Sequence, residues 1–528
     1  MYRINQVRLP IGFDESRLVD YLTEKLKLNK SHLSNVELYK LSIDARDKND
    51  LHYKAGIVFD YAAKLNIAKY KNLDEYIPED LSVEKWSGDA RHIVVVGSGP
   101  SGLFAAIRLI ESGAKVTMVE RGYEMSKRKQ AVASLMDNGV LDTKSNIQFG
   151  EGGAGTFSDG KLNTGIKSKY IRLVLETFHK FGADKNILYD ARAHIGTDVL
   201  STIIVNMREY FKSLGGRVLF ETKFIDFEEK NGVLTGAVLE NENKVWTEPC
   251  DKVVLAIGHS SRDTIRKLRD RSISFKKKPF SLGYRIEHLQ ADINASQYGT
   301  STTAKMLPPA DYHLVEHVGD RVVYSFCMCP GGVVVPAMSE DGTIVTNGMS
   351  YNARDGVNSN SAILVSVGIN DFPSEDELSG IEMQEEIEKK AYQKSNSYNA
   401  TVQTVGDFLQ GRPTTTLGRV TPSYRPGFVL GSVEDVLPEF VVSALKVGIP
   451  KLANKLKCFD DKDALLTAAE TRSSAPYQVV RNANMETSIV GLCAIGEGAG
   501  FAGGIVSSAV EGLKCADIII KNNNNCFE

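Results

Sequence analysis

Hydrophobic and polar positions over the first 88 residues follow the periods of a small mixed domain. Tyr2 to Leu9 is typical of a strand, and Asp14 to Leu28 carries apolar residues near helical spacing. Val36 to Arg46 and His52 to Tyr61 are typical of a hairpin joined across a polar turn. This βαββ order predicts a compact α+β accessory domain over residues 1–88, and we find no catalytic constellation within it.

The pattern that follows is the most informative in the chain. A β-branched run, Ile93 to Val96, leads into a turn with the spacing Gly-x-Gly-x-x-Gly, which begins at Gly97. A helical run from Leu103 to Ser112 and a second apolar strand, Lys115 to Val119, come after the turn. Glu120 ends that strand, 18 residues beyond the last glycine of the turn.

Each residue type in this unit suits a dinucleotide. Gly97 permits the tight turn, Gly99 lets the backbone approach a pyrophosphate, and Gly102 lets helix and strand pack closely. The start of the helix offers free N–H groups and a positive dipole end to the phosphates. Glu120 falls where an acid reaches a ribose hydroxyl. The order of elements predicts a dinucleotide-binding βαβ unit; an incidental glycine-rich turn in another α/β protein is the alternative.

Two further glycine clusters repeat this spacing without its context. They run from Gly150 to Gly155 and from Gly498 to Gly503. No β-branched run of strand length leads into the first, and the second leaves no room for a following strand and acid. Neither predicts a second fold that holds NAD(P)H stably. Both predict glycine loops where the backbone approaches one large cofactor.

The remaining sequence predicts an α/β protein in which one domain interrupts another. Three short strands are expected to form a β-meander that leads to a buried strand: Arg217 to Leu219, Lys223 to Glu228, Val233 to Leu239, and then Lys252 to Ile257. We expect a nucleotide-binding domain in two parts, 89–269 and 466–528, around an inserted α+β domain, 270–465. The run Asn522 to Asn525 predicts a frayed tail.

Composition and charge exclude some partners. The 528 residues are 42% hydrophobic and 24% charged, with a formal net charge of −3. This balance offers no positive field for nucleic acid or for an anionic membrane, so we expect neither partner. We find no apolar run long enough to cross a bilayer and no signal-peptide pattern at Met1 to Gln6. Seven scattered cysteines predict reduced thiols and a cytoplasmic protein.

Long strings of residues carry a resemblance to a known family. They are Gly153 to Lys161, His194 to Asp198, Ala256 to Asp263, Ser325 to Gly332, Thr346 to Ser350 and Gly496 to Gly504. Over residues 90–520 the chain resembles a bacterial group of FAD-dependent dehydrogenases, or NAD/FAD-utilising oxidoreductases. This group lies within the glutathione-reductase-type FAD-binding superfamily, in its two-domain branch.

The resemblance implies one non-covalent FAD. A middle strand would reach it at Ala256-Ile257-Gly258, and a C-terminal strand would reach it at Gly496-Glu497, where Glu stands in place of the usual Asp. A helix starting at Gly503, Gly504 and Ile505 would aim its N-terminus at the pyrimidine edge of the flavin. The expected cofactor-binding residues are Gly97, Ser98, Gly99, Pro100, Ser101, Gly102, Glu120, Arg121, Gly152, Gly153, Ala154, Gly155, Ala256, Gly258, Gly496, Glu497, Gly503, Gly504 and Ile505.

Three candidate residues lie in strings that the resemblance brings near the flavin. Lys161 would pair with a phosphate or with the reduced edge of the ring; a merely exposed lysine is the alternative. Cys327 and Cys329, if they lie on a strand, would point to the same face and form a redox pair, contact the flavin or bind a soft metal. Two ligands are too few for a tetrahedral metal site, so we expect no metal. Inert buried thiols are the alternative that we favour.

Histidines and arginines supply the remaining candidates. His259 directly follows the Ala-Ile-Gly turn and is a candidate for acid–base work, although such a histidine is more often structural. Arg472 would bind a substrate carboxylate through its planar guanidinium group. Weaker candidates of the same two kinds are Arg285, His288, His313 and His317.

We therefore expect an FAD-dependent oxidoreductase. It would transfer a hydride between the flavin and a small organic substrate, with NAD(P)H docking transiently as the reductant. One alternative is a flavoprotein that modifies RNA, and another is a non-catalytic FAD protein whose N-terminal module binds a partner. All of these require that Gly97, Gly153 and Gly503, far apart in the chain, face a single cavity.

Overall fold

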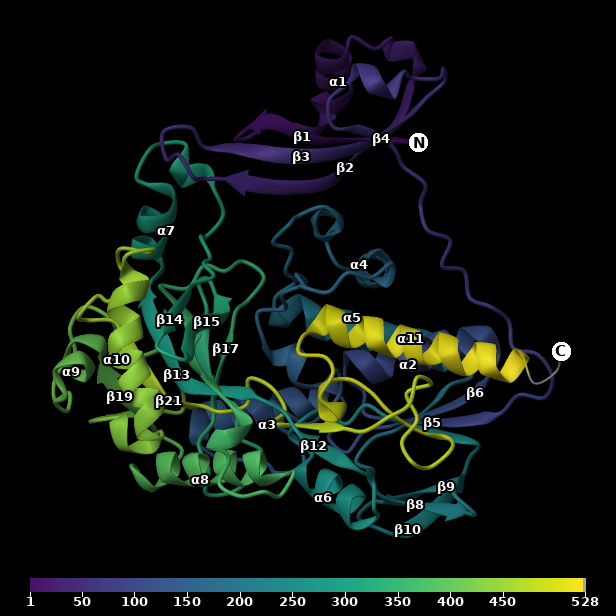
Figure 1. Ribbon diagram of the computed structural model, residues 1–528, viewed down its shortest axis with the longest axis vertical. Helices are drawn as coiled ribbons and strands as arrows, with labels where there is room; N and C mark the ends of the chain where they lie inside the picture. The colour runs from purple at the N-terminus through teal and green to yellow at the C-terminus, as the bar shows by residue number, and fades with distance from the viewer. Residues whose placement is uncertain (526–528) are drawn as a thin grey trace.

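The N-terminal residues form a small antiparallel sheet with one helix (Figure 1). The computed structural model, which describes residues 1–525, places its elements as follows: β1 (Tyr2–Pro10), α1 (Leu18–Leu26), β2 (Leu33–Asp44), β3 (His52–Tyr61) and β4 (Leu73–Glu75). The sheet order is β2-β3-β1-β4, so the expected βαββ order is present and β4 extends it. Leu18, Leu22 and Leu26 of α1 share one buried cluster with Ile57 and Phe59 of β3.

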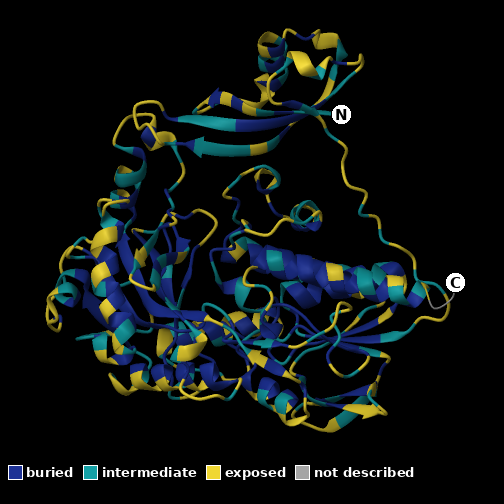
Figure 2. Ribbon diagram, viewed as in Figure 1, coloured by how far each residue is buried: buried dark blue, intermediate teal, exposed yellow. Residues whose placement is uncertain are grey.

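A largely exposed segment, residues 76–91, connects this sheet to the rest of the molecule (Figure 2). Near its end, the Ser87 N–H donates to Asn524 Oδ1 at 2.9 Å, and Asn523 Nδ2 donates to the Ser87 carbonyl at 2.9 Å. The last helix, α11 (Ile505–Asn524), therefore continues into the asparagine run. The expectation of a frayed tail over Asn522 to Asn525 is wrong, because these amides fasten the helix end to the connecting segment.

A five-stranded parallel sheet lies at the centre of the nucleotide-binding region. Its order is β23-β11-β5-β6-β7, with β5 (His92–Val96), β6 (Lys115–Val119), β7 (Arg217–Leu219), β11 (Lys252–Leu255) and β23 (Leu492–Ala494). Every neighbouring pair is parallel. Ile93 and Val95 enter one hydrophobic cluster while Val94 and Val96 enter another, so the sheet is covered on both faces. Burial on both faces explains the continuous apolar runs of these strands.

Helices cover one face of this sheet and a small meander covers the other (Figure 1). The first layer contains α2 (Pro100–Ser112), α4 (Tyr170–Lys180), α5 (Thr197–Ser213) and α11; the second contains α6 (Arg262–Asp270), β8 (Lys223–Lys230), β9 (Val233–Glu240) and β10 (Val245–Pro249). β7 was expected in the meander, but it pairs with β6 as the edge of the parallel sheet. The meander takes β10 in its place.

The inserted region is built on a seven-stranded sheet of order β14-β15-β18-β13-β21-β19-β20. Its strands are β13 (Phe280–Leu289), β14 (Val315–Val318), β15 (Arg321–Cys329), β18 (Asn358–Val367), β19 (Ala400–Thr404), β20 (Phe428–Leu430) and β21 (Leu465–Glu470). Four helices belong to the same region: α7 (Gln290–Tyr298), α8 (Ser379–Gln393), α9 (Val405–Gln410) and α10 (Glu439–Ala453). β13 and β18 lie near the middle of the sheet, and nearly all of their residues are buried.

Short elements join the two regions. They are α3 (Met125–Asn138), the pair β12 (Phe275–Lys277) and β22 (Tyr477–Val479), and the pair β16 (Val333–Pro336) and β17 (Thr346–Met349). β22 follows β21 directly, so the chain passes from the large sheet back to the nucleotide-binding region at this point. Within residues 1–525, no helix is both long enough and apolar enough to cross a membrane.

Candidate functional site

A cavity of about 350 Å³ lies between the parallel sheet and the inserted region. Gly97, Gly153 and Gly503 all lie in its wall, although they come from three distant segments. Other wall segments follow β6, β11 and β23 at their carboxyl ends, where open parallel sheets bind ligands. The inserted region completes the wall with a smaller group of residues: Phe326, Cys327, Asn347, Glu470, Arg472 and Ser473.

Most of the expected cofactor-binding residues lie in this wall. Those that do are Gly97, Ser98, Gly99, Pro100, Ser101, Glu120, Arg121, Gly153, Ala154, Gly155, Ala256, Gly258, Gly496, Glu497, Gly503, Gly504 and Ile505. Gly102 and Gly152 are not among the lining residues. A Cβ at Gly102 would overlap the Gly97 carbonyl oxygen, and one at Gly152 would overlap Thr156 Oγ1. These two glycines serve packing behind the wall, as expected for Gly102.

The first glycine turn is fixed by contact with the strand beside it. Gly97 has φ +102°, and a Cβ there would overlap the carbonyl oxygen of Ala256 at the end of β11. A Cβ at Gly153 would come within 2.9 Å of Gly99 Cα, so the second glycine loop packs directly on the first. The absence of side chains therefore lets two backbone segments form one side of the cavity.

Arg128 of α3 holds the second glycine loop in place. Its side chain is fully buried and donates to the carbonyl oxygens of Asn146, Ile147, Gly150, Glu151 and Gly153, at 2.5 to 3.2 Å. Burial lowers the pKa of Arg128 to about 10, which leaves it charged at neutral pH. The sequence analysis missed this residue, because a charged residue inside a helical run carries no sign that it will be buried against a loop.

Glu120 lies in the wall but uses both of its carboxylate oxygens on the loops around it. Oε2 accepts from the Ser98 N–H and Oγ at 3.1 and 2.7 Å, and Oε1 accepts from the N–H groups of Gly122 and Gly150 at 2.9 and 3.0 Å. Glu120 therefore joins the first glycine turn to the second. The ribose contact remains a prediction that would add to these bonds. Next to it, Arg121 lies over the Phe149 ring at 4.1 Å and pairs with Asp263.

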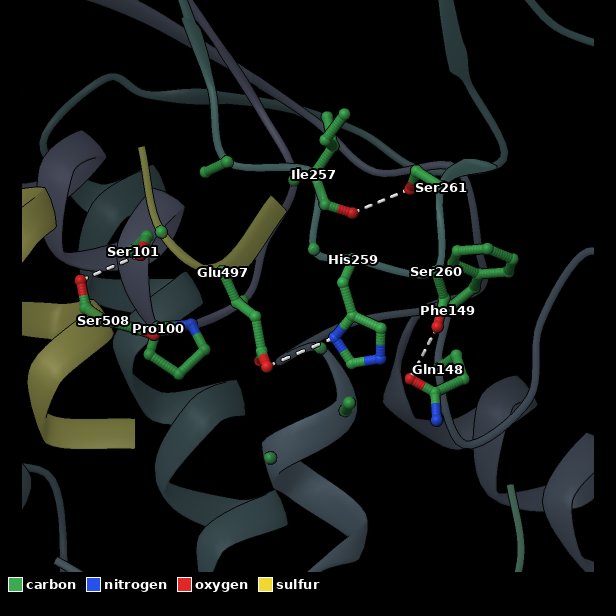
Figure 3. Close-up of a pocket in the computed structure, with 18 of the residues that line it drawn as sticks. Pro100, Ser101, Gln148, Phe149, Ile257, His259, Ser260, Ser261, Glu497 and Ser508 are labelled. Atoms are coloured by element: carbon green, nitrogen blue, oxygen red, sulfur yellow. Dashed lines mark hydrogen bonds and ion pairs between the residues drawn. The ribbon is translucent and has the colours of Figure 1, made fainter. Parts of the chain in front are cut away.

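The segment after β23 approaches the segment after β11 across the cavity (Figure 3). His259 Nδ1 lies 3.4 Å from Glu497 Oε1, while His259 Nε2 is buried and has no hydrogen-bond partner among residues 1–525. Ser101 Oγ of α2 donates to the Ser508 carbonyl of α11 at 2.9 Å. The helices α2 and α11 therefore begin side by side at this wall, with their positive ends toward the cavity.

These features fit a dinucleotide that carries a flavin. A Cβ at Gly258 or Gly503 would meet no protein atom within 4 Å, so space for a ligand lies against the backbone at both positions. The N-termini of α2 and α11 suit negative charge, and the orphaned Nε2 of His259 offers a polar contact. A long cofactor needs contacts along its whole length, and here backbone from three separate segments lines the cavity.

Lys161 lines the cavity in a cluster of charges, where its own charge acts on Cys327 of the inserted region. Its Nζ is 2.8 Å from Asp159 Oδ2, and Arg354 donates to the same carboxylate from Nε and Nη2 at 3.0 and 2.5 Å. Ser350 donates to Asp159 as well. Asp159 is fully buried, which by itself would raise its pKa; the two cations outweigh this and lower the pKa to about 2. Lys161 is therefore held by a permanent anion, and it is not a free exposed lysine.

Cys327 and Cys329 lie on β15 at a break in the strand. The pairing of β15 with β18 shifts register between Phe326 and Cys329, and Cys327 has φ +44°. The sequence predicted that both side chains would point to the same face of a strand. The break in the strand means that they do not lie on one regular face. Cys327 lines the cavity and is half-buried, whereas Cys329 is buried behind it.

Arg472 lines the cavity, but other residues occupy its guanidinium group. Nε and Nη2 donate to Glu388 at 3.0 and 2.8 Å, and Nη1 donates to Ser260 and Ser339 at 3.1 and 2.6 Å. Arg262 of α6 donates to the same buried Glu388. Arg472 therefore joins the inserted region to the nucleotide-binding region. A role in binding a substrate carboxylate remains a prediction for which this geometry leaves few donors.

None of the four weaker candidates is a lining residue of the cavity. Arg285 is fully buried on β13 and pairs with Glu470, and His288 Nε2 lies 2.9 Å from the Phe459 carbonyl oxygen. His313 and His317 are exposed. The structure instead brings Glu470 of β21 into the wall beside Cys327. Only the apolar run before Glu470 hinted at a buried acid, and it did not show which cavity the acid would face.

Models of protein families match three segments of the chain. Residues 279–473 match the description "FAD-dependent protein, C-terminal domain-like", residues 92–148 match an FAD binding domain, and residues 1–58 match a domain of unknown function. An uncharacterized protein of Clostridium beijerinckii is 43% identical over 528 residues, covering 98% of each chain. The chain belongs to the same family as this protein. It is a family of FAD-binding proteins, and FAD is the cofactor of this chain.

Solved structures of flavoproteins are also similar to this FAD-binding protein at low identity. CtdE in complex with FAD is 12% identical, with 82% of this chain and 84% of that chain covered and a TM-score of 0.33. The geranylgeranyl bacteriochlorophyll reductase-like protein of Thermoplasma acidophilum is 14% identical, with 83% of both chains covered and a TM-score of 0.35. The flavin-dependent brominase Bmp2 is 12% identical, with 83% and 80% covered and a TM-score of 0.39. The expected FAD-binding Rossmann-like fold rests on the family models and the parallel sheet.

Proposed function

We propose that this protein is an FAD-dependent oxidoreductase that transfers a hydride between the flavin and a small organic substrate. The single observation that supports this most is the shared cavity. One end is lined by the glycine segments of the nucleotide-binding region, and the other by polar and apolar side chains of the inserted region. A flavin supplies hydride chemistry when it is bound, and the second end offers a place for a reacting molecule.

The protein would bind and orient the cofactor through backbone groups. Gly97 to Ser101 and the start of α2 suit the pyrophosphate, because the helix N-terminus presents free N–H groups. Gly504 and Ile505 would direct the positive end of α11 toward the flavin, which favours negative charge there. Arg128 would keep the second glycine loop fixed throughout, since its five carbonyl partners leave that loop little freedom.

The inserted region would bind the substrate and exclude water. Phe326 offers an apolar surface, while Asn347 and Ser473 offer hydrogen bonds, and Lys161 of the nucleotide-binding region adds another in the same wall. A small number of polar groups within an enclosed cavity fixes the orientation of a ligand. The ion network of Arg262, Arg472 and Glu388 would keep this wall closed against the nucleotide-binding region.

A nicotinamide nucleotide is the reductant that we propose, and it would dock transiently. The sequence has one full strand-turn-helix-strand-acid unit, at Gly97, and FAD would use it. The proposal includes a cytoplasmic location, which is supported by the thiols: the six cysteines among residues 1–525 are all unpaired. Cys526 lies outside the described residues.

Anaerobic reduction of the purified protein tests the proposal. We expect a yellow preparation whose flavin absorbance is bleached by NADH or NADPH and restored by a subset of small organic acceptors. As a control, the variant Gly165→Ala should be bleached and restored like the native protein, because Gly165 has open space around its Cα and lies outside the cavity wall. Bound flavin that no nicotinamide nucleotide and no organic substrate reduces would contradict the oxidoreductase and favour an FAD protein that binds a partner without catalysis.

A further inference from the structure

The end of the cavity formed by the inserted region contains a thiol and a carboxyl group whose charges depend on one another. Cys327 and Glu470 both line this end, and Arg285 lies behind them. Arg285 Nη1 is 3.2 Å from both carboxylate oxygens of Glu470, and Nη2 donates to the Cys327 carbonyl at 2.6 Å. One buried cation therefore contacts the Glu470 carboxyl group and the Cys327 backbone, and its charge also acts on the Cys327 thiol.

Arg285 cannot turn away from this pair. Its Nε donates to Asn360 Oδ1 at 2.6 Å, and its Nη2 also lies 3.3 Å from Cys329 Sγ. A Cβ at Gly348 would overlap the guanidinium group, so the glycine of β17 is what admits it. A fixed positive charge therefore lies buried directly beneath the cavity wall. Its electrostatic interactions with neighbouring groups are strong there, because the dielectric is low.

The bulge in β15 places the Cys327 side chain in the cavity. The positive φ at Cys327 is uncommon for a residue other than glycine, and it coincides with the register shift between Phe326 and Cys329. Cys327 is half-buried, while Cys329 is fully buried and has the Cys327 carbonyl within 3.4 Å. Bulges often redirect a side chain at a functional site.

Charged and titratable groups face Cys327 from every surrounding segment. They are Cys329 of β15, Arg285 of β13, Glu470 of β21, and Lys161 and Asp159 of the loop before α4. A hydrogen bond from Cys329 lowers the pKa of Cys327; burial opposes this, and the positive charges of Arg285 and Lys161 support it. Burial raises the pKa of Glu470 to about 7, with Arg285 opposing and the Cys327 charge adding to the rise.

We propose that Cys327 is a nucleophilic thiolate and Glu470 its partner acid, at a site that takes a substrate with an aldehyde carbon. The inference rests on the proposed function only in placing the substrate at this end of the FAD cavity. Glu470 retains its proton when Cys327 has lost its own, so the site holds a nucleophile and a proton donor at the same pH. Arg285 is a positioning residue that compensates the single negative charge.

The chemical step is an addition in which no electrons are gained or lost overall. The Cys327 sulfur forms a bond to the carbonyl carbon, the carbon–oxygen π bond breaks, and its electron pair moves to the oxygen. Glu470 gives its proton to that oxygen and becomes a carboxylate opposite Arg285. The product is a hemithioacetal that requires no further reactant. Lys161, in the same wall and held by Asp159, adds a positive charge that favours negative charge on the oxygen during the step.

An aldehyde matches this set of groups better than a carboxylate does. The arginines that would pair with a carboxylate, Arg285 and Arg472, are already engaged by Glu470 and by Glu388. A thiolate is a strong nucleophile toward a carbonyl carbon, and an adjacent acid completes the addition. A neutral polar carbon compound also enters a half-apolar cavity at lower desolvation cost than an anion does.

Alkylation of the full-length protein with bound FAD tests the nucleophile. Iodoacetamide is added at several pH values, and peptide mass spectrometry gives the rate of modification at each cysteine. At pH 7 we expect Cys327 to react at least about tenfold faster than Cys458, because an ordinary thiol is only a few per cent ionised there. Cys458 is the internal control, since it is also half-buried and burial raises its pKa. A Cys327 that reacts no faster than Cys458, or only above about pH 8.5, overturns the proposal.

Protection by an aldehyde tests the substrate class and the partner acid. Benzaldehyde and butyraldehyde are used as probes, and we expect at least one to slow the alkylation of Cys327 in a saturable way without slowing that of Cys458. In the native protein, apparent aldehyde affinity should stay level up to about pH 7, where Glu470 loses its proton. In Glu470→Gln the affinity should begin to fall at a lower pH, because the adduct must then take its proton from solvent.

Two outcomes would contradict this part of the inference. Absence of protection by both aldehydes overturns the substrate class, and identical pH profiles in the native protein and Glu470→Gln overturn the role of Glu470. Cys327→Ser supplies a second measurement, since it should keep FAD and lose aldehyde-dependent effects. Thiol modification does not depend on flavin reduction, so a flavin that NAD(P)H never bleaches would count against the oxidoreductase alone.

Discussion

The two ends of the cavity are built in opposite ways. The end assigned to FAD is lined by backbone: Gly97, Gly99, Gly153 and Gly503 remove side chains so that a ligand can approach. The other end is lined by side chains whose charges are balanced over long separations in the chain, such as Arg472 with Glu388. The backbone arrangement of the first end is common to many nucleotide-binding proteins. We propose that the second decides which molecule reacts.

This difference teaches where specificity is placed in such a protein. Backbone N–H groups and helix ends do not titrate at moderate pH, so the contacts they offer to FAD keep their character there. The inserted region contains buried groups with strongly shifted pKa values, such as Asp159, lowered, and Glu470, raised. Perturbed pKa values gather at functional sites, which makes the second end the more informative about the reaction.

The largest expected effect comes from removing the support of the FAD end. Arg128→Met should lower the free energy of unfolding by about 4 kcal/mol and release FAD. The reason is that five carbonyl groups of the loop lose the guanidinium group that donates hydrogen bonds to them. Chemical denaturation and flavin content measure the two effects. The matched control is Lys129→Met, a neighbouring exposed residue of the same helix, which should change neither. A stable Arg128→Met protein with full flavin content would show that the loop needs no such support.

The next effect comes from adding one methyl group to the first glycine turn. Gly97→Ala should cost about 3 kcal/mol of stability, since the new Cβ overlaps the Ala256 carbonyl at a left-handed backbone position. The measurement is thermal unfolding of protein prepared without added FAD, which separates folding from binding. Gly165→Ala, which meets open space, should leave the transition unchanged. Equal transitions for the two variants would mean that the turn tolerates a side chain.

A pH titration distinguishes the charged end from the backbone end. Glu470 has a pKa raised to about 7 in the folded protein, so the folded state binds the extra proton and stability falls as pH rises from about 4.5 to 7. Glu470→Gln should remove this slope, and its stability relative to the native protein should rise by about 2 kcal/mol between pH 5 and 8. The constant cost of leaving Arg285 unpaired does not affect the slope.

The measurement is urea unfolding at several pH values. Glu382→Gln, which replaces an exposed glutamate of α8, is the control and should parallel the native curve. Parallel curves for Glu470→Gln and Glu382→Gln would show that Glu470 titrates in the folded protein as it does in the unfolded chain.

The smallest effect should be confined to binding. Gly503→Ala adds a methyl group that meets no protein atom, so the fold should keep its stability while FAD affinity falls about tenfold through contact with the ligand. Titration of the flavin-free protein with FAD, followed by fluorescence, gives the dissociation constant. Unchanged affinity would place the flavin away from the start of α11 and would weaken the description of the first end.

Much of the FAD end could be predicted from the sequence because its signals are local. The spacing of Gly97, Gly99 and Gly102 between two apolar runs predicted β5, α2 and β6 within a few residues. The assignment of β7 to the meander failed for the opposite reason: three residues, Arg217 to Leu219, fit either sheet, and only packing beside β6 decides between them. The tail at Asn522 was misjudged likewise, since its partners lie more than 400 residues away at Ser87.

The charged end was predicted only as a set of unconnected candidates. The sequence singled out Cys327, Arg285 and Arg472. The structure shows that Arg285 pairs with Glu470 and that Arg472 pairs with Glu388. Charge type and position in the chain do not reveal a partner that lies on another strand or helix. The strand break at Cys327 was also hidden, because a bulge depends on the pairing of two strands that are not adjacent in sequence.

The sequence by itself determined the cofactor class and the parallel sheet, because a glycine turn between hydrophobic strands acts through backbone geometry that neighbouring residues set. Only the tertiary structure decided which side chains meet at the far end of the cavity. Electrostatic interactions there join residues from separate strands in a low dielectric, and their strength depends on distances that folding alone establishes. The cavity thus combines one end, which we assign to the cofactor, fixed by local sequence, with another, which we assign to the substrate, fixed by long-range packing.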